Sequence, residues 1–462
     1  MASKTGLLSL RTRRDKMVDS SGAEIRLRGV CIGGWLNMEN FISGYAGSES
    51  LMRSDVRAAI GDDRAEEFFE RFLQSFFDEA DATFLAAQGF NAVRIPVNYR
   101  HLESDSKPFE IIESGFRHLD RAIEQCGSRG IYSIIDLHAL PGCQNQDWHS
   151  DNETHVAGFW LHPHFQDRTV NIWEAIASRY RGNPWVAGYN LMNEPADESR
   201  KVVGRFYGRL VAAVRAIDPD HTIFVDGNTY STEFDIFTEQ WDNTVYVLHD
   251  YIPSGFGHGG PYPGLTNGEW IDREYAERQF TERSGYARET YSPIVVGEFG
   301  PTYTGDAEKD AQRGRALEDQ LDIYHKYDAS WFVWVYKDLG RQGLVSVKPG
   351  SPYGQRFGDF VAKKNRLGAD QWGSTGVGVR EVTEPIQDLV AREFPSFEPY
   401  PWGRVDWVRR LVLNIMIARP LSQEYAGLLC GLDDSELKAL TDSFAFNNCE
   451  VKESLVERLR RG

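Results

Sequence analysis

The chain has 462 residues, 41% of them hydrophobic, and a formal net charge of −17 at pH 7. This net negative charge argues against electrostatic binding to nucleic acid or anionic lipid and favours a neutral partner. The five scattered cysteines form no CxxC pair or His-flanked cluster, so neither a zinc module nor a disulfide framework is predicted, and we expect no metal and no cofactor; they are Cys31, Cys126, Cys143, Cys430 and Cys449.

The beginning of the chain, MASKTGLLSLRTRRDKM, has only a four-residue apolar run before its arginines. Such a run is too short for the apolar region of a signal peptide. No segment approaches eighteen consecutive apolar residues, so no membrane span is predicted. We therefore expect a cytoplasmic protein, whose oligomeric state the sequence does not indicate.

In chain order, MVDSSGAEIRL (17–27) resembles a hairpin with a Ser-Gly turn. Eight short apolar runs with strand character follow, separated by segments of helical length and period. They are LRGVCIGG (27–34), NAVRIPV (91–97), YSIIDLH (132–138), VAGYNLMNE (186–194), TIFVDG (222–227), TVYVLHDY (244–251), PIVVGEFG (293–300) and SWFVWVYKD (330–338).

Strands that alternate with helices predict parallel pairing through right-handed crossovers. Eight such units indicate an α/β fold closed into a (β/α)₈ TIM barrel, with the hairpin plugging its bottom. The main alternative is a doubly wound sheet. It would need a Gly-rich phosphate turn after an early strand, and CIGGWLN (31–37) does not match GxGxxG.

The C-terminal part is less regular. Residues 341–381 are Gly-rich and are expected to form a long rim loop, after which EPIQDLVAREF (384–394) would close the barrel. We interpret 1–395 as the catalytic barrel, 396–403 as a linker and 404–462 as a helical extension packed on the barrel, because so few residues would hardly form their own core.

Polar residues gather at the carboxyl ends of the predicted strands, where a barrel has its active-site mouth. Each has a structural interpretation: Glu194 suits a helix N-terminus, Glu298 pairs with Arg94, and the histidines are satisfied core residues. Six strands placing buried polar groups at one rim are harder to explain in this way, since each costs about 1–3 kcal/mol unless paired. The group is Arg94, His138, Asn193, Glu194, His249, Tyr251, Glu298 and Trp334.

Two carboxylates on facing strand ends are the equipment for glycoside hydrolysis, in which one donates a proton and the other attacks the anomeric carbon. Asn193 would bind the 2-hydroxyl of the sugar, and Trp334 would support the ring. Arg94 and Tyr251 would keep Glu298 ionised, while His249 would tune Glu194. We expect burial to raise the pKa of Glu194 towards about 6, which predicts a two-limbed pH profile with a mildly acidic optimum.

These motifs resemble those of glycoside hydrolase family 5, a group of retaining (β/α)₈ enzymes, over about residues 25–395. By position, the resemblance implies that Glu194 is the acid/base and Glu298 the nucleophile. LHALPGCQNQDWHSDN (137–152) is similar to the PGxQN loop of the family's fungal exo-β-1,3-glucanases. That similarity implies that Trp35, Asn145 and Trp148 lie near the glycone subsite.

Neither a signal peptide nor disulfides are predicted. In this respect the chain resembles the intracellular fungal branch of the family, whose relatives cleave glucosylated sterols and glucosylceramide. The resemblance implies a retaining β-glucosidase acting on a small glucoside, a glucan end or a glycolipid. Long rim insertions at 139–165, 252–270 and 341–381 favour a closed pocket and therefore exo action. Four alternatives stay open: a transglycosylase, a glycosidase for another sugar or a disaccharide glycoside, a non-catalytic carbohydrate-binding or scaffolding barrel, and a metal-dependent hydrolase. The last would use His149, Asp151 and His155.

Overall fold

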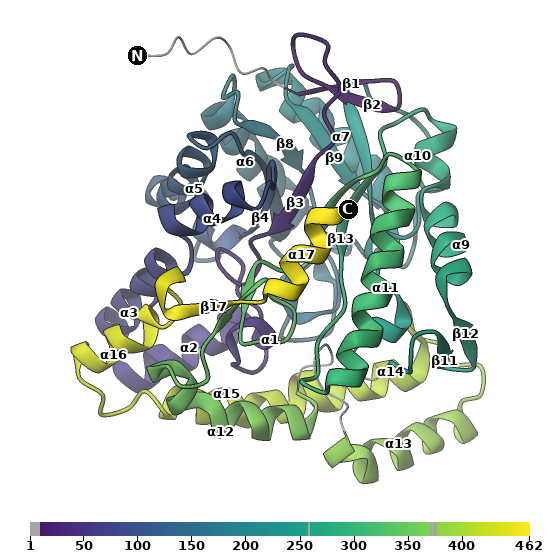
Figure 1. Cartoon of the computed structure of the whole chain (residues 1–462). Helices are drawn as coiled ribbons and strands as arrows, with labels where there is room; N and C mark the ends of the chain where they lie inside the picture. Colours follow the sequence, from purple (N-terminus) through teal and green to yellow (C-terminus); the bar gives the residue numbers. More distant parts are fainter. Residues whose placement is uncertain (1–9, 257–258, 370–371, 373–376) are drawn as a thin grey trace.

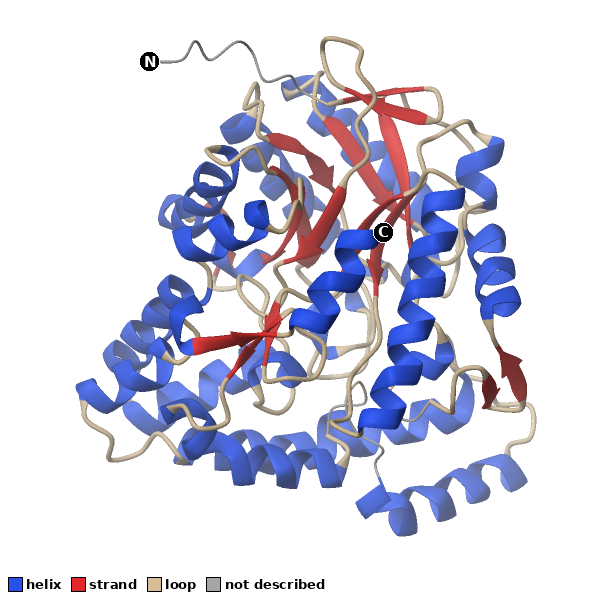
Figure 2. Cartoon of the chain, in the orientation of Figure 1, coloured by secondary structure: helices blue, strands red, loops and turns tan. Residues whose placement is uncertain are grey.

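Eight parallel strands close into a barrel in the computed structural model, which describes residues 10–256, 259–369, 372 and 377–462 (Figures 1 and 2). The eight strands agree with the eight predicted runs, so the expected TIM barrel is confirmed. In order around the barrel they are β3 (Arg28–Cys31), β4 (Ala92–Asn98), β7 (Tyr132–Ala139), β8 (Val186–Asn190), β9 (Thr222–Asp226), β10 (Thr244–His249), β13 (Val295–Phe299) and β14 (Ser330–Val333).

Amphipathic helices cover the outside of the barrel. In α5 (Arg117–Gly127), for example, Leu119, Ala122, Ile123 and Cys126 are buried at a spacing of three and four, which is one face of a helix. No helix of the described residues is long and apolar enough to cross a membrane. The covering helices are α3 (Asp62–Phe76), α4 (Glu79–Ala87), α5 (Arg117–Gly127), α6 (Pro163–Tyr180), α7 (Val203–Ile217), α9 (Arg273–Arg283), α10 (Gly285–Glu289) and α11 (Ala307–Lys326).

The predicted N-terminal hairpin lies a few residues earlier than expected. Strands β1 (Arg11–Arg13) and β2 (Lys16–Val18) pair antiparallel, and the Ser-Gly turn leaves one further bridge between Val18 and Glu24. Leu10 is fully buried, and its carbonyl accepts a hydrogen bond from Thr222 at the start of β9. The hairpin therefore sits at the amino ends of the strands, opposite the mouth.

The long irregular loop expected at 341–381 is partly wrong, because helix α12 (Pro352–Leu367) occupies its centre. Ser351 caps the helix by accepting from the Gly354 N–H, and Gly368 ends it in the left-handed conformation. The several glycines of this stretch predict a loop, and this prediction missed an apolar face with helical spacing. Residues 370–371 and 373–376 of the expected loop lie outside the described residues.

The helix expected to close the barrel does not lie on it. Helix α13 (Arg380–Glu393) buries only Thr383, and its Val390 packs on the small apolar cluster around Val408 in α14 (Gly403–Arg410). The last helix of the chain, α17 (Glu453–Arg461), packs against α11 instead, with a salt bridge of 3.1 Å between Arg458 and Glu318. Figure 1 shows α17 on the barrel and α13 apart from it.

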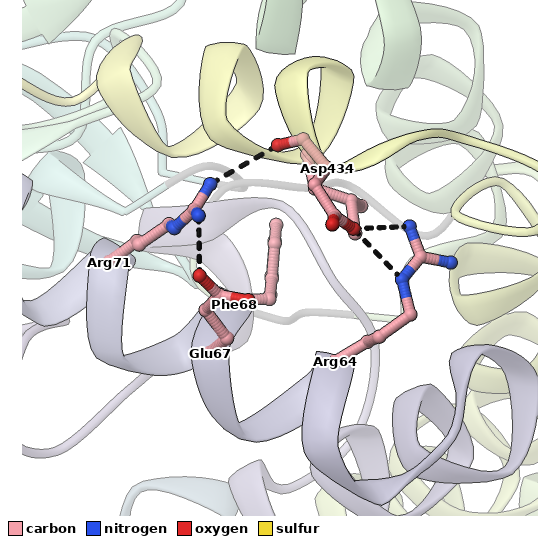
Figure 3. Close-up of a pocket in the computed structure, with 6 residues that line it drawn as sticks. Arg64, Glu67, Phe68, Arg71 and Asp434 are labelled. Carbon is pink, nitrogen blue, oxygen red and sulfur yellow. Dashed lines mark hydrogen bonds and ion pairs between the residues drawn. The ribbon is translucent and has the colours of Figure 1, made fainter.

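The C-terminal extension also contacts the barrel's helices. In Figure 3, α16 (Asp434–Asp442) lies on α3, where Arg64 pairs with the Asp434 carboxylate and Arg71 donates to its backbone oxygen. The hollow between the two helices is about 10 Å³, room for about one water. It is a helix contact and not a substrate site. The extension also contains π-helix η7 (Leu411–Ile417), α15 (Ala418–Gly427) and the short helix η8 (Phe446–Asn448).

A buried lysine ties the extension to the barrel. Lys337 and Asp81 have no solvent exposure and are joined at 2.7 Å, and the same ammonium donates to the carbonyls of Phe76 and Phe444. Lys337 is the first residue of β15 (Lys337–Asp338). This strand forms a three-stranded sheet with β16 (Val345–Val347) and β17 (Cys449–Val451). The extension thus contributes both a strand and a carbonyl to the region behind the mouth.

We expect Lys337→Met to destabilise the protein by about 3–5 kcal/mol, because it leaves the Asp81 carboxylate buried without its cation. Urea unfolding measures the loss. Lys438→Met, which removes an exposed pair with Asp442, is the matched control and should stay within about 0.5 kcal/mol of the parent. Equal losses in the two variants would contradict the role assigned to Lys337.

Candidate active site

Glu298 lies near the end of β13 and is held by two donors. Arg94 of β4 donates from Nη1 to Glu298 Oε1 at 2.7 Å, and the Tyr251 hydroxyl donates to Oε2 at 2.9 Å. The Glu298 side chain is 6% exposed. The two donors, one on β4 and one just beyond β10, bind different oxygens, so they fix the orientation of the Glu298 carboxylate.

Glu194 lies four residues beyond the end of β8, whereas the sequence placed it at the strand end. Its backbone is in the left-handed region (φ 45°), and its N–H donates to Asp226 Oδ2 at 3.0 Å. Asn145 donates to its carbonyl, also at 3.0 Å. The carboxylate receives His249 Nδ1 at 2.6 Å on one oxygen and His149 Nε2 at 3.1 Å on the other.

The two carboxylates face one another across the barrel mouth. One oxygen of Glu194 and one of Glu298 lie, together with a ring nitrogen of His249, within 4.8 Å of one another. Strands β8 and β13 are three steps apart around the barrel, as the sequence predicted. A retaining glycosidase has its carboxyl groups about 5–5.5 Å apart and an inverting one about 6.5–9.5 Å, so oxygens this close are nearer to the retaining arrangement.

Arg94 also orders the polar residues beneath the two acids. It is 1% exposed, and besides Glu298 its guanidinium donates to Asn190 Oδ1 at 2.9 Å and to Asn193 Oδ1 at 2.7 Å. The Asn193 amide nitrogen lies 3.3 Å from His138 Nε2. Because Asn193 Oδ1 is held by Arg94, its NH₂ group is directed away from Arg94, to the side of His138.

Trp334 and His138 form one wall of the site. Trp334 directly follows β14 and stacks on the His138 ring, with centroids 5.5 Å apart and an interplanar angle of 13°. A side chain at Gly33 would collide with the indole, which explains the glycine there. His138 Nδ1 is 2.7 Å from the Asp136 carboxylate, and its Nε2 is 3.6 Å from Glu39.

Comparisons with known proteins agree with this geometry. The model of the Cellulase family (glycosyl hydrolase family 5) matches residues 66–340. A protein named Beta-xylosidase from Phanerodontia chrysosporium is 42% identical over 461 residues, covering 96% of each chain. The chain belongs to glycosyl hydrolase family 5. It is therefore a glycoside hydrolase of the retaining β-glycosidase type, as the sequence motifs indicated.

More distant family 5 relatives cover the barrel. A protein named "Probable glucan 1,3-beta-glucosidase A" from Neosartorya fischeri is 27% identical over 354 residues, which is 69% of this chain and 84% of the relative. A crystal structure of a glycoside hydrolase superposes with a TM-score of 0.53 at 22% identity, covering 71% of this chain and 94% of that one. At that identity the likeness shows the fold alone.

The expected pKa of Glu194 is wrong for this arrangement. Burial acts to raise it, but the hydrogen bonds from His149 and His249 outweigh burial and hold the pKa of Glu194 below its usual range. Burial opposes the charge on His149, yet the hydrogen bond to Glu194 raises the pKa of His149 to about 9. Near neutral pH the proton shared by Glu194 and His149 therefore resides on His149.

Of the three residues expected near the glycone subsite, only Trp35 lies away from it. Its ring is fully buried, packs 5.6 Å from Phe77, and donates to the Leu73 carbonyl behind the barrel wall. Asn145 contacts Glu194 through its carbonyl, as described above. Trp148 is 7% exposed and meets the His149 ring edge-on at 6.4 Å.

Three site residues of this family 5 enzyme were not predicted as such. Glu39 is 3% exposed, its Oε1 has no hydrogen-bond partner among the described residues, and burial raises its pKa to about 8. His149 was considered only as a metal ligand. Trp372 packs edge-on against Tyr251 with centroids 4.8 Å apart. Each comes from a loop without strand or helix periodicity, so the sequence offered only their residue types as a signal.

The metal ligands considered in the loop at 147–155 do not converge. His149 contacts Glu194, Asp151 pairs with Arg100 at 2.6 Å, and His155 lies 3.0 Å from the Gln146 carbonyl. Among the described residues, the one group of acidic and histidine side chains close enough for an ion is Glu194, His249 and Glu298. These are the residues that the retaining geometry already employs.

Proposed function

We propose that this family 5 enzyme is an exo-acting β-glucosidase that works by double displacement, with Glu298 as nucleophile and Glu194 as acid/base. The single observation that carries the assignment of roles is the pair of environments. Glu298 is held by Arg94 and the Tyr251 hydroxyl, whereas Glu194 lies between two histidines that can exchange a proton with it. A nucleophile must stay ionised, and an acid/base must gain and lose a proton.

In the first step, Glu298 Oε2 or Oε1 attacks the anomeric carbon while Glu194 protonates the glycosidic oxygen. The bond from carbon to the leaving oxygen breaks, the aglycone departs as an alcohol, and a covalent glycosyl–enzyme ester remains. In the second step, Glu194 takes a proton from water, whose oxygen attacks the same carbon. The ester bond breaks, Glu298 is again a carboxylate, and the sugar leaves with its original anomeric configuration.

The side chains around the glycone support release of one sugar unit. Trp334 offers an apolar ring face, and Asn193 has an amide NH₂ group beside the His138 ring. Glu39, with a pKa of about 8, is protonated at neutral pH and can both donate to and accept from sugar hydroxyls. Trp372 packs against Tyr251, which in turn donates to Glu298. Aromatic rings and polar groups gathered around the two acids would contact the hydroxyls of a terminal sugar unit, which supports action on a chain end.

Glucose is the first candidate for the glycone, and the partner is a small glucoside, a glucan end or a glycolipid in the cytoplasm. Xylose is the second candidate, because the relative with 42% identity over 96% of this chain is named Beta-xylosidase. The two sugars differ only by the hydroxymethyl group at carbon 5. Transfer of the sugar to an acceptor other than water would use the same covalent intermediate.

We expect the protein to release p-nitrophenol from its β-D-glucoside and to discriminate against the β-D-xyloside by about 1–3 kcal/mol in kcat/KM, the range for one small group in a fitted pocket. A panel with β-mannoside and β-galactoside, and with the α-glucoside as control, measures this preference. Proton NMR of the first product tests retention. A higher kcat/KM for the xyloside would replace glucose as the glycone, and an inverted product would refute the double displacement.

A further inference from the structure

The acid/base Glu194 is connected to the C-terminal extension through the loop at 145–152. His149 Nε2 contacts Glu194 Oε2 at 3.1 Å, and its Nε2 also lies 2.9 Å from the Asn145 amide. One ring nitrogen cannot donate to Glu194 and accept from Asn145 at the same time. Protonated His149 therefore bonds to Glu194, and neutral His149 can instead accept from Asn145, so both protonation states have a partner.

Asp147 supplies a negative charge to the same loop. It is 4% exposed, accepts from the Tyr230 hydroxyl at 2.9 Å, and forms an ion pair with Arg410 of helix α14. The linker that leads into α14 is anchored beside it, because Trp402 packs on the Tyr230 ring with centroids 5.1 Å apart. Arg410 thus holds the Asp147 carboxylate in place next to His149.

We propose that His149, set by the Asp147–Arg410 pair, is a positioning residue that stores the proton of the acid/base Glu194. The inference rests on the proposed function of Glu194. When a glycosidic oxygen binds beside Glu194, the proton moves from His149 Nε2 to Glu194 Oε2, and Glu194 then gives it to the leaving oxygen. In the second step, the proton that Glu194 takes from water returns to His149, so the two residues end each turnover as they began.

Several charged or titratable groups face this pair from different elements. Around His149 they are Glu194, Asp147, Glu39, His138 and Tyr230; around Glu194 they are His149, His249, Glu298 and Asp226. For His149, burial disfavours the charge, but Glu194, Asp147 and Glu39 all raise its pKa, to about 9. The pair should therefore keep its one proton until the pH approaches about 9.

The alkaline limb of kcat/KM reports loss of the proton that the acid must donate. In His149→Gln, glutamine cannot store a proton, so the limb reports Glu194 with only its other partner, His249, beside it. We expect it to move towards acid by about one pH unit or more, a tenfold or greater change in proton affinity. Asp147→Asn should move the limb in the same direction but less, because it removes one of the charges that raise the pKa of His149.

A double-mutant cycle separates this role from a structural one. Since Asp147 acts through His149, Asp147→Asn should not move the limb further in the His149→Gln background. His155→Gln, in the same loop but bonded to the Gln146 carbonyl, is the matched control and should leave the limb in place. A fall in rate without a moved limb in His149→Gln, or an equal shift by Asp147→Asn in both backgrounds, would overturn the proposal.

The imidazole of His149 gives a readout independent of activity. In an NMR titration of the full chain, we expect it to titrate well above the ordinary histidine value of about 6.5 and to fall in Asp147→Asn and Glu194→Gln. Titration at or below the ordinary value would refute proton storage even in an active enzyme. A high value in a protein inactive on every glycoside would instead retain the proton pair and refute the proposed function.

Discussion

Glu298→Ala should lower hydrolysis of p-nitrophenyl β-D-glucoside by about 10⁴- to 10⁶-fold, the usual cost of removing a covalent nucleophile. The change removes the atom that attacks the anomeric carbon and leaves Arg94 and Tyr251 without the carboxylate that they bind. Initial rates of p-nitrophenol release measure it. The remaining cavity admits a small anion, and azide should bind there beside the Arg94 guanidinium.

Azide should partly restore p-nitrophenol release by Glu298→Ala. Because azide then attacks the β-glycoside directly from the side that Glu298 occupied, the product is the α-glycosyl azide, which NMR identifies. Glu153→Ala, at an exposed carboxylate bonded to Ser50 at the rim, is the matched control and should keep wild-type activity. A Glu298→Ala protein that hydrolyses the β-glucoside normally would remove Glu298 from the nucleophile's role.

Glu194→Ala should produce an effect that depends on the leaving group. For an alkyl or sugar aglycone, which needs a proton to depart, the rate should fall by about 10²- to 10⁴-fold. A dinitrophenolate can depart without a proton, so formation of the glycosyl–enzyme from a dinitrophenyl glycoside should stay fast. Hydrolysis of that intermediate needs a base and should therefore slow. Stopped-flow absorbance should then show a burst of dinitrophenol about equal to the enzyme concentration.

In Glu194→Ala, azide attacks the glycosyl–enzyme ester, and two inversions give the β-glycosyl azide. The opposite anomers from the two variants thus identify which glutamate has which role. His221→Gln offers a control for imidazole loss elsewhere, since that ring pairs with Asp218 just before the amino end of β9, opposite the mouth. An α-azide from Glu194→Ala would exchange the two roles, and equal losses for all leaving groups would contradict acid catalysis.

The sequence by itself determined the barrel and its two acids. The eight apolar runs are local patterns, each strong enough to form a strand between amphipathic helices, and their number and alternation leave few topologies. Glu194 and Glu298 stand out because they end or follow such runs. Arg94, His138, Asn193, His249, Tyr251 and Trp334 were predictable for the same reason, since parallel strands bring their carboxyl ends to one rim.

Only the tertiary structure decided which loop residues join them. Glu39, His149 and Trp372 come from segments without periodicity, and the direction of Trp35 depends on whether its ring finds more apolar contact behind the wall than at the mouth. Helix α17 rather than α13 lies on the barrel, and the strand before it, β17, pairs with β16, which is about a hundred residues away in the sequence. The pKa of Glu194 likewise follows from its distances to His149 and His249. The electrostatic interaction of two charges depends on their separation and burial, and the order of residues in the sequence specifies neither of these.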